Sequence, residues 1–204
     1  QRVENRWIGV NSGIMDQMVV ASAQEHHALL LDCRSLHVRH VPIPDTIAVV
    51  VMDTATRRGL VDSAYNERRR QCEAAAAYCA VTALRDLTSA QLEAARLARD
   101  DTTYRRARHV VSENARTLAA AAALRAGEVR ALGQLMNESH ASLRDDFEVT
   151  NRELDAIVAL AQADAACYGA RMTGAGFGGC AVALVEAAAK DAFCRAVLES
   201  YRAR

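Results

Sequence analysis

The sequence predicts an α+β protein, with strands near both ends of the chain and helices between them. Three observations predict this arrangement. Aliphatic and β-branched runs fill residues 28–53, alanine-rich segments without glycine or proline fill residues 60–84 and 102–126, and a glycine-rich stretch separates two apolar runs within residues 168–185. Strands and helices that are segregated along the chain, rather than regularly alternating, are typical of the α+β class.

The first strands are expected at residues 28–33, 38–43 and 46–53. The first is a short apolar run, the second alternates apolar and polar residues, and the third is strongly β-branched, as expected for a buried strand. The chain has 2 prolines, Pro42 and Pro44, and both lie just before the third strand. They therefore mark a junction between the second and third strands.

The middle of the chain is expected to be helical. Helices are predicted over residues 60–84, 89–98, 102–126, 128–143 and 151–166. Ser89 is expected to cap the second helix, and either Asp101 or Thr102 the third, since short polar side chains satisfy free amides at helix starts. Gly127 is expected to end the third helix.

The last part of the chain returns to strands around a glycine loop. Strands are expected at residues 168–172 and 180–185, and a closing helix at residues 186–201. The loop between the strands carries the glycines Gly174, Gly176, Gly178 and Gly179. A dinucleotide-binding fingerprint needs a helix directly after its glycines, so the apolar strand that follows argues against that function. The loop is then either a phosphate-cradling turn, whose N–H groups face a ligand, or a tight turn without a ligand.

Composition excludes several classes of function. The chain has 25 basic and 25 acidic residues, so it offers no electrostatic case for nucleic-acid binding. It contains no apolar run of the roughly 18 residues that a membrane helix needs, and its first residues lead into no secretory h-region. The 6 cysteines form no Cys-x-x-Cys pair and are interpreted as buried free thiols in a reducing compartment. We therefore expect a cytoplasmic protein without nucleic-acid or membrane partners.

A lone carboxylate near the start of the chain is the first candidate for chemistry. Asp16 follows the glycine-dense approach GVNSG, which ends at Gly13, and precedes an apolar run. A glycine close to a carboxylate lets backbone and ligand approach each other. A carboxylate and a glycine-rich loop together suggest phosphoryl transfer, in which positioning and electrostatics do most of the work.

Several long motifs, in order along nearly the whole chain, extend this idea. They are Glu4-Asn5 and residues 9–17, 27–36, 63–73, 106–114, 139–149 and 173–179. Together they resemble the galactokinases, which belong to the GHMP small-molecule kinase superfamily. The resemblance implies a GHMP kinase fold. Residues 1–57 would be a remnant of the N-terminal domain with the catalytic aspartate, and residues 58–204 the C-terminal domain with motif 3.

The resemblance also implies roles for individual residues. Asp16 falls on the catalytic aspartate, which orients the C1 hydroxyl of the sugar and takes its proton. Gly13 would let the backbone approach the sugar, and Tyr65 falls on a tyrosine that contacts galactose. Glu4 falls on an acidic residue associated with the magnesium ion. The phosphate and sugar loop would be formed by Gly174, Gly176, Gly178 and Gly179.

Two charged runs are interpreted as structural rather than as parts of the site. Residues 67–73 contain three consecutive arginines between glutamates, at the spacing of ion pairs on one helix. Residues 144–146 are interpreted as a turn between helices.

The implied activity is ATP-dependent phosphorylation of galactose to galactose 1-phosphate, with Mg²⁺ and a monomeric parent enzyme. N-acetylgalactosamine kinase, arabinokinase and a non-catalytic galactose sensor stay open as alternatives. The family's arginine-containing galactose signature and its phosphate loop of motif 2 are absent from this sequence. We therefore expect the chain to be the C-terminal portion of a galactokinase and to be inactive when isolated. A further alternative is a fragment that has no function of its own, although its parent would be a kinase.

Overall fold

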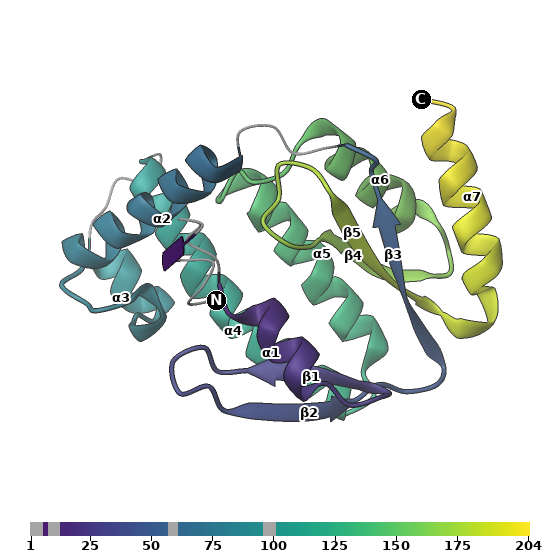
Figure 1. Ribbon diagram of the computed structural model, residues 1–204, viewed down its shortest axis with the longest axis horizontal. Coiled ribbons are helices and arrows are strands. Elements are labelled where there is room, and N and C mark those ends of the chain that lie inside the picture. Colours follow the sequence, from purple (N-terminus) through teal and green to yellow (C-terminus); the bar gives the residue numbers. More distant parts are fainter. Residues whose placement is uncertain (1–5, 8–12, 57–60, 96–100) are drawn as a thin grey trace.

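The computed structural model of the chain describes residues 6–7, 13–56, 61–95 and 101–204. Strands and helices are segregated along the chain, so the predicted α+β class is confirmed (Figure 1). The elements in order are α1 (Met15–Ser22), β1 (His27–Leu31), β2 (Val38–Pro42), β3 (Ile47–Asp53), α2 (Val61–Tyr78), η2 (Leu84–Asp86), α3 (Ser89–Ala94), α4 (Thr102–Arg125), α5 (Val129–Asp145), α6 (Arg152–Ala163), β4 (Cys167–Met172), β5 (Cys180–Glu186), η3 (Ala187–Ala189) and α7 (Lys190–Arg202).

The strands form two antiparallel sheets. β1 and β2 make a hairpin in which Leu29 lies opposite His40. The second sheet has the order β3-β5-β4, so β5 is central and pairs with both neighbours. Val50 of β3 and Ala170 of β4 both lie opposite Ala183 of β5. The sheet therefore joins a strand from the first part of the chain to two strands from its end.

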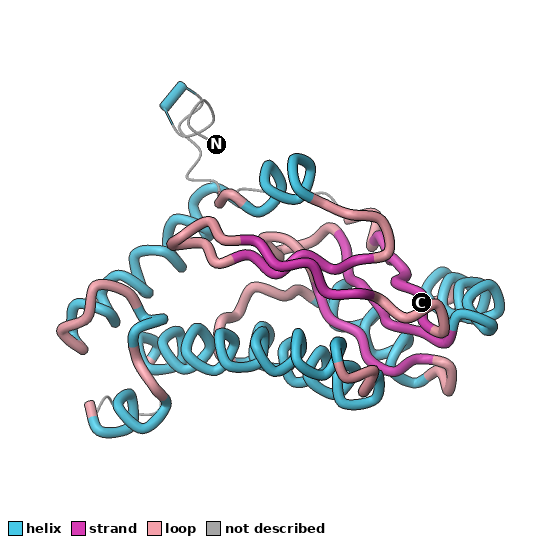
Figure 2. The backbone as a smooth tube through the Cα atoms, turned by 90° about the horizontal axis from the view of Figure 1, so that it is seen from below, coloured by secondary structure: helices cyan, strands magenta, loops and turns pink. Residues whose placement is uncertain are grey.

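The main hydrophobic core lies between this sheet and the helices α6 and α7. Small side chains on the sheet, such as Ala170 and Ala183, leave room for Leu154 of α6 and Phe193 of α7, which are 0% and 1% exposed. Burying each of these large side chains stabilises the fold by about 1.5–3 kcal/mol. Figure 2 shows the strands lying along one side of a row of helices.

Helix α5 runs unusually close to β4. A Cβ atom at Gly133 of α5 would lie 2.0 Å from the carbonyl oxygen of Tyr168, and one at Gly169 of β4 would lie 2.0 Å from the carbonyl oxygen of Gly133. Only glycine at both positions allows the two backbones to approach this closely. This contact sets how closely the first part of α5 lies against β4.

Several elements differ from the sequence-based expectation; α6, for example, ends at Ala163 rather than at residue 166. Residues 15–22 form α1, which the sequence pattern did not predict because eight residues carry too little periodicity to identify a helix. Helix α2 ends at Tyr78 rather than at residue 84. Ala80 adopts a positive φ of 52°, and the Val81 amide donates to the Ala76 carbonyl oxygen at 3.0 Å. An alanine thus ends the helix in the conformation usually taken by glycine, and no sequence signal marks it.

Helix caps test the predictions most directly. Thr88, rather than Ser89, caps α3, and it forms a reciprocal capping box with Gln91. The cap of α4 is Asp101, whose carboxylate accepts from the Thr103 amide at 2.7 Å. Helix α4 then ends before Gly127, whose φ is +72°. Helix α3 ends at Ala94, so the predicted end at residue 98 is wrong.

The cysteines are free, as predicted, but the predicted burial is wrong. Cys33 and Cys194 are exposed, and the remaining four are half-buried. Among the described residues, no helix has the length and apolar character needed to cross a lipid bilayer.

Candidate functional site

The glycine loop joins β4 to β5 over residues 173–179. All its glycines have positive φ angles, with values of +78°, +83°, +133° and +83° for Gly174, Gly176, Gly178 and Gly179. Residues with side chains rarely adopt this conformation, so the glycine density is a requirement of the backbone path. The apolar run after the loop is β5, and the prediction that no helix follows the glycines is confirmed.

The loop is anchored on both sides. Near its middle, the Phe177 amide donates to the Val149 carbonyl oxygen at 2.7 Å. At its end, the carbonyl oxygen of Gly179 accepts from the Thr54 hydroxyl at 2.7 Å, and the Gly179 amide donates to the carbonyl oxygen of Thr56 at 3.3 Å. These bonds tie the loop to the α5–α6 connection and to the segment after β3, so its backbone is held in one shape.

Several backbone amides of the loop donate to no described residue. Within the described part of the chain, no hydrogen bond is donated by the amides of Gly174, Ala175, Gly176 and Gly178. Successive N–H groups in alternating conformations form concave sites for anions. The loop can therefore donate to a phosphate or to a sugar hydroxyl without breaking an existing bond.

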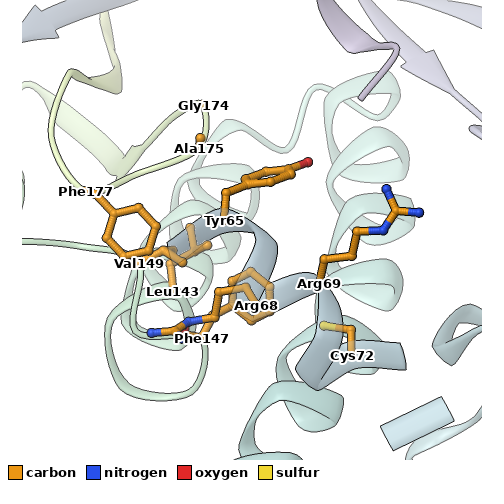
Figure 3. Close-up of a pocket in the computed structure, with 10 residues that line it drawn as sticks. All are labelled: Tyr65, Arg68, Arg69, Cys72, Leu143, Phe147, Val149, Gly174, Ala175 and Phe177. Atoms are coloured by element: carbon orange, nitrogen blue, oxygen red, sulfur yellow. The ribbon is translucent and has the colours of Figure 1, made fainter. Parts of the chain in front are cut away.

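A cavity of about 310 Å³ lies between this loop and α2 (Figure 3). Its lining residues are Tyr65, Arg68, Arg69, Cys72, Leu143, Phe147, Val149, Gly174, Ala175 and Phe177. Figure 3 shows the ring of Tyr65 beside Gly174 and Ala175, with its hydroxyl pointing away from the apolar cluster around Phe177. Tyr65 is half-buried, so it can pack against a ligand while its hydroxyl stays available for a hydrogen bond.

The arginines of this cavity are engaged with the protein. Arg68 donates to the carbonyl oxygens of Phe147 at 2.6 Å and Glu148 at 3.0 Å. Burial, and then the nearby Arg106, lower the pKa of the Arg68 guanidinium. Arg69 donates to Glu73 at 2.9 Å, one helical turn away. The pairs Arg69–Glu73 and Arg70–Glu67 are those expected of an ion-pair cluster on one helix. Arg68 bonds to carbonyl oxygens instead, and both it and Arg69 line the cavity.

The charged residues 144–146 are also structural, but the turn begins later than predicted, because α5 extends to Asp145. Arg144 pairs with Asp145 at 2.7 Å at the end of α5, and Asp146 pairs with Arg108 of α4. The second pair links the end of α5 to α4.

Asp16 lies in the first turn of α1, and its side chain is exposed. Helix α1 sits beside the β1–β2 hairpin, where the Ser22 carbonyl oxygen accepts from His40 at 2.6 Å (Figure 1). Asp16 is not among the residues that line the cavity of Tyr65 and Gly174. Gly13 is exposed, and a Cβ atom placed on it would have no described atom within 4 Å.

The structure therefore brings together only some of the predicted site residues. Tyr65 and Gly174 share the cavity, and Gly176, Gly178 and Gly179 belong to the same loop. Glu4 lies outside the described residues. Over the described ranges, no group of three or more His, Cys, Asp or Glu side chains could hold a metal ion.

Comparison with known proteins identifies the relatives of this chain. Residues 120–203 match the family model described as GHMP kinases C terminal. A galactokinase of Roseiflexus sp. (strain RS-1) is 48% identical over 206 residues, a match that covers 98% of this chain and 53% of the relative. The chain is similar to that galactokinase over almost its whole length. It spans about half the length of the relative that it matches.

Solved structures show the same similarity. Lactococcus lactis galactokinase, crystallised with galactose, superposes with a TM-score of 0.93 at 43% identity, covering 98% of this chain and 53% of that one. The predicted GHMP kinase fold is thereby confirmed. L. major mevalonate kinase in complex with R-mevalonate shares the fold at 22% identity, with a TM-score of 0.51 over 87% of this chain and 44% of its own.

Proposed function

We propose that this chain is the part of a galactokinase that transfers the γ-phosphoryl group of ATP to the C1 hydroxyl of galactose, which yields galactose 1-phosphate in galactose metabolism. The observation that carries the proposal is the likeness of almost the whole chain to the galactose-bound L. lactis galactokinase. The cavity of Tyr65 beside a glycine loop with unpartnered amides supports it chemically.

In this proposal Asp16 is the catalytic base. Its carboxylate orients the C1 hydroxyl of the sugar and takes the proton of that hydroxyl as the γ-phosphoryl group arrives. An exposed carboxylate that has no hydrogen bond to another described residue is available for this work. Gly13 allows the backbone to approach the sugar, and Tyr65 packs on the sugar ring and donates a hydrogen bond from its phenol.

The glycine loop would hold the phosphate and sugar through its amides. Gly174, Gly176 and Gly178 give the backbone its concave shape, and Gly179 closes the loop onto the segment after β3. Mg²⁺ typically takes one or two carboxylates and completes its shell with phosphate oxygens and water. Glu4 would supply such a carboxylate, and the bound ion would neutralise charge on the phosphates.

We propose that residues 1–57, with Asp16, and residues 58–204, with the glycine loop, correspond to two parts of the kinase, although β3 of the first part pairs with β5 of the second. The free thiols support a reducing, cytoplasmic location. A monomeric parent enzyme is also proposed.

A chimaera tests the proposal. The matching 206 residues of the Roseiflexus galactokinase are replaced by this chain, and galactose-dependent ADP release is measured. We expect product, and we expect Asp16→Asn to lower kcat by about 10²–10⁴-fold, as for loss of a general base. Asp45→Asn is the matched control, because Asp45 is an exposed carboxylate before β3 and outside the cavity.

The same chimaera separates the alternatives. Faster turnover of N-acetylgalactosamine or arabinose than of galactose would indicate a related sugar kinase. Galactose binding without any product would indicate a sensor. A folded chimaera whose activity is unaffected by Asp16→Asn would contradict the assigned base.

A further inference from the structure

The connection between α5 and α6 is held by bonds from outside it. Residues 146–149, named here the support turn, present four consecutive carbonyl oxygens. Each of them accepts a hydrogen bond from another part of the chain: Asp146 from Arg106, Phe147 and Glu148 from Arg68, and Val149 from the Phe177 amide. Two arginines therefore hold three carbonyls of the support turn, and the fourth holds the glycine loop.

Arg106 is the central member of this arrangement. It lies in α4 with only 2% of its surface exposed, which is exceptional for an arginine. Its Nε donates to Gln71 Oε1 at 2.9 Å, its Nη1 donates to the Asp146 carbonyl oxygen, and its Nη2 donates to Glu148 Oε2 at 2.7 Å. The planar fork of a guanidinium can satisfy these three directions at once, whereas an ammonium cannot.

Negative charge for this buried cation comes from Glu148. The carboxylate of Glu148 also accepts from Arg105 at 2.8 Å and lies 3.9 Å from Arg68. The backbone of Glu148 has a φ of +54°, which residues with side chains rarely adopt. Such a conformation persists only where the surroundings determine it, and here the surroundings are the arginines.

The support turn is in direct contact with the glycine loop. A Cβ atom at Gly176 would lie 2.1 Å from the Val149 carbonyl oxygen, so no space separates the two backbones. The Phe177 amide donates to that same oxygen at 2.7 Å. Phe177 itself has a φ of +59°. A displacement of the support turn must therefore displace the loop or break this bond.

We propose that Arg106 is a positioning residue for the glycine loop. It holds the support turn, and the support turn sets the loop's shape through Val149, although Arg106 is not among the residues that line the cavity. What the loop then binds rests on the proposed function. The mechanical coupling between Arg106 and the loop does not.

Amide hydrogen exchange in the ¹⁵N-labelled 204-residue chain tests the coupling. The two rates compared are those of the Phe177 amide and of the Val158 amide, which lies in the buried core helix α6. In Arg106→Gln we expect Phe177 to exchange about tenfold faster relative to Val158, because the support turn loses its charged donor. Arg106→Lys keeps the charge but not the fork, so we expect an intermediate rate.

Controls make the result decisive. Arg125→Gln changes an exposed arginine of the same helix and should leave the ratio unchanged. If circular dichroism shows that Arg106→Gln does not fold, Glu148→Gln is used instead, because it removes the partner charge. It should raise the ratio of the Phe177 to the Val158 exchange rate, by less than the factor expected for Arg106→Gln. Equal acceleration of Phe177 and Val158, or no acceleration, in the folded variants would overturn the proposal, because Arg106 would then stabilise the fold without positioning the loop.

A galactose titration of the chimaera followed by NMR separates this inference from the proposed function. Weaker galactose binding in Arg106→Lys, with loop amides responding, supports both. A wild-type chimaera whose amides do not respond to galactose counts against the proposed function. The exchange ratio still decides the role of Arg106 in that case.

Discussion

Substituting alanine for Gly176 is expected to cost about 2–4 kcal/mol of unfolding free energy, from two separable causes. The first is the backbone conformation: φ is +83°, and a residue with a side chain pays about 1 kcal/mol there. The second is contact. The new Cβ would lie 2.1 Å from the Val149 carbonyl oxygen and 3.0 Å from the Val149 carbonyl carbon, so the backbones must separate.

The size of the second cause follows from the bond that the separation breaks. The Phe177 amide donates to the same Val149 oxygen at 2.7 Å. Moving the two backbones apart by about an ångström leaves this donor and acceptor poorly paired, which costs about 1–3 kcal/mol.

Gly127→Ala is the matched comparison. Gly127 also has a positive φ, of +72°, but a Cβ atom placed on it would have no neighbouring atom within 4 Å, so only the conformational cost of about 1 kcal/mol applies. Urea unfolding should show a lower midpoint with an unchanged slope for both variants. For a chain of this size, thermal midpoints should fall by about 2–4 °C per kcal/mol. Equal losses for Gly127→Ala and Gly176→Ala would refute the close contact between loop and support turn.

Two further predictions concern stability. Gly133→Ala should destabilise the protein by more than about 2 kcal/mol in urea unfolding, because the new Cβ would lie 2.0 Å from the Tyr168 carbonyl oxygen. Helix propensity alone predicts a gain of about 1 kcal/mol, so a stabilised variant would disprove the close approach. Burial lowers the pKa of the His109 imidazole to about 4. Below about pH 6.5 the imidazole is therefore protonated in the unfolded state but stays neutral in the folded state. The free energy of unfolding should fall by roughly 2–3 kcal/mol as the pH is lowered from 6.5 to 4. His109→Gln should flatten this part of the pH profile relative to wild type, and an unchanged slope would rule out His109 as its source.

Much of the fold could be predicted from local sequence preferences. The β-branched run at residues 46–53, the cap at Asp101 and the end of α4 before Gly127 follow from preferences of single residues and their immediate neighbours. The ion pairs of residues 67–73 follow from helical spacing alone. Where a local signal was absent or ambiguous, the expectation failed: Ala80 ends α2 without a glycine, and Thr88 rather than Ser89 caps α3.

The sequence was therefore enough to establish the class of fold, the glycine loop between two strands and the family resemblance. Each of these depends on patterns of residues that are close together in the chain. What the loop touches became known only from the folded arrangement. The bond from Phe177 to Val149 and the fork of Arg106 on the support turn join segments separated by 28 and about 40 positions. Such contacts depend on how α4, α5 and β4 pack, and two glycines allow that packing where α5 meets β4. No preference of an individual residue encodes this geometry, because it arises only when the backbones meet.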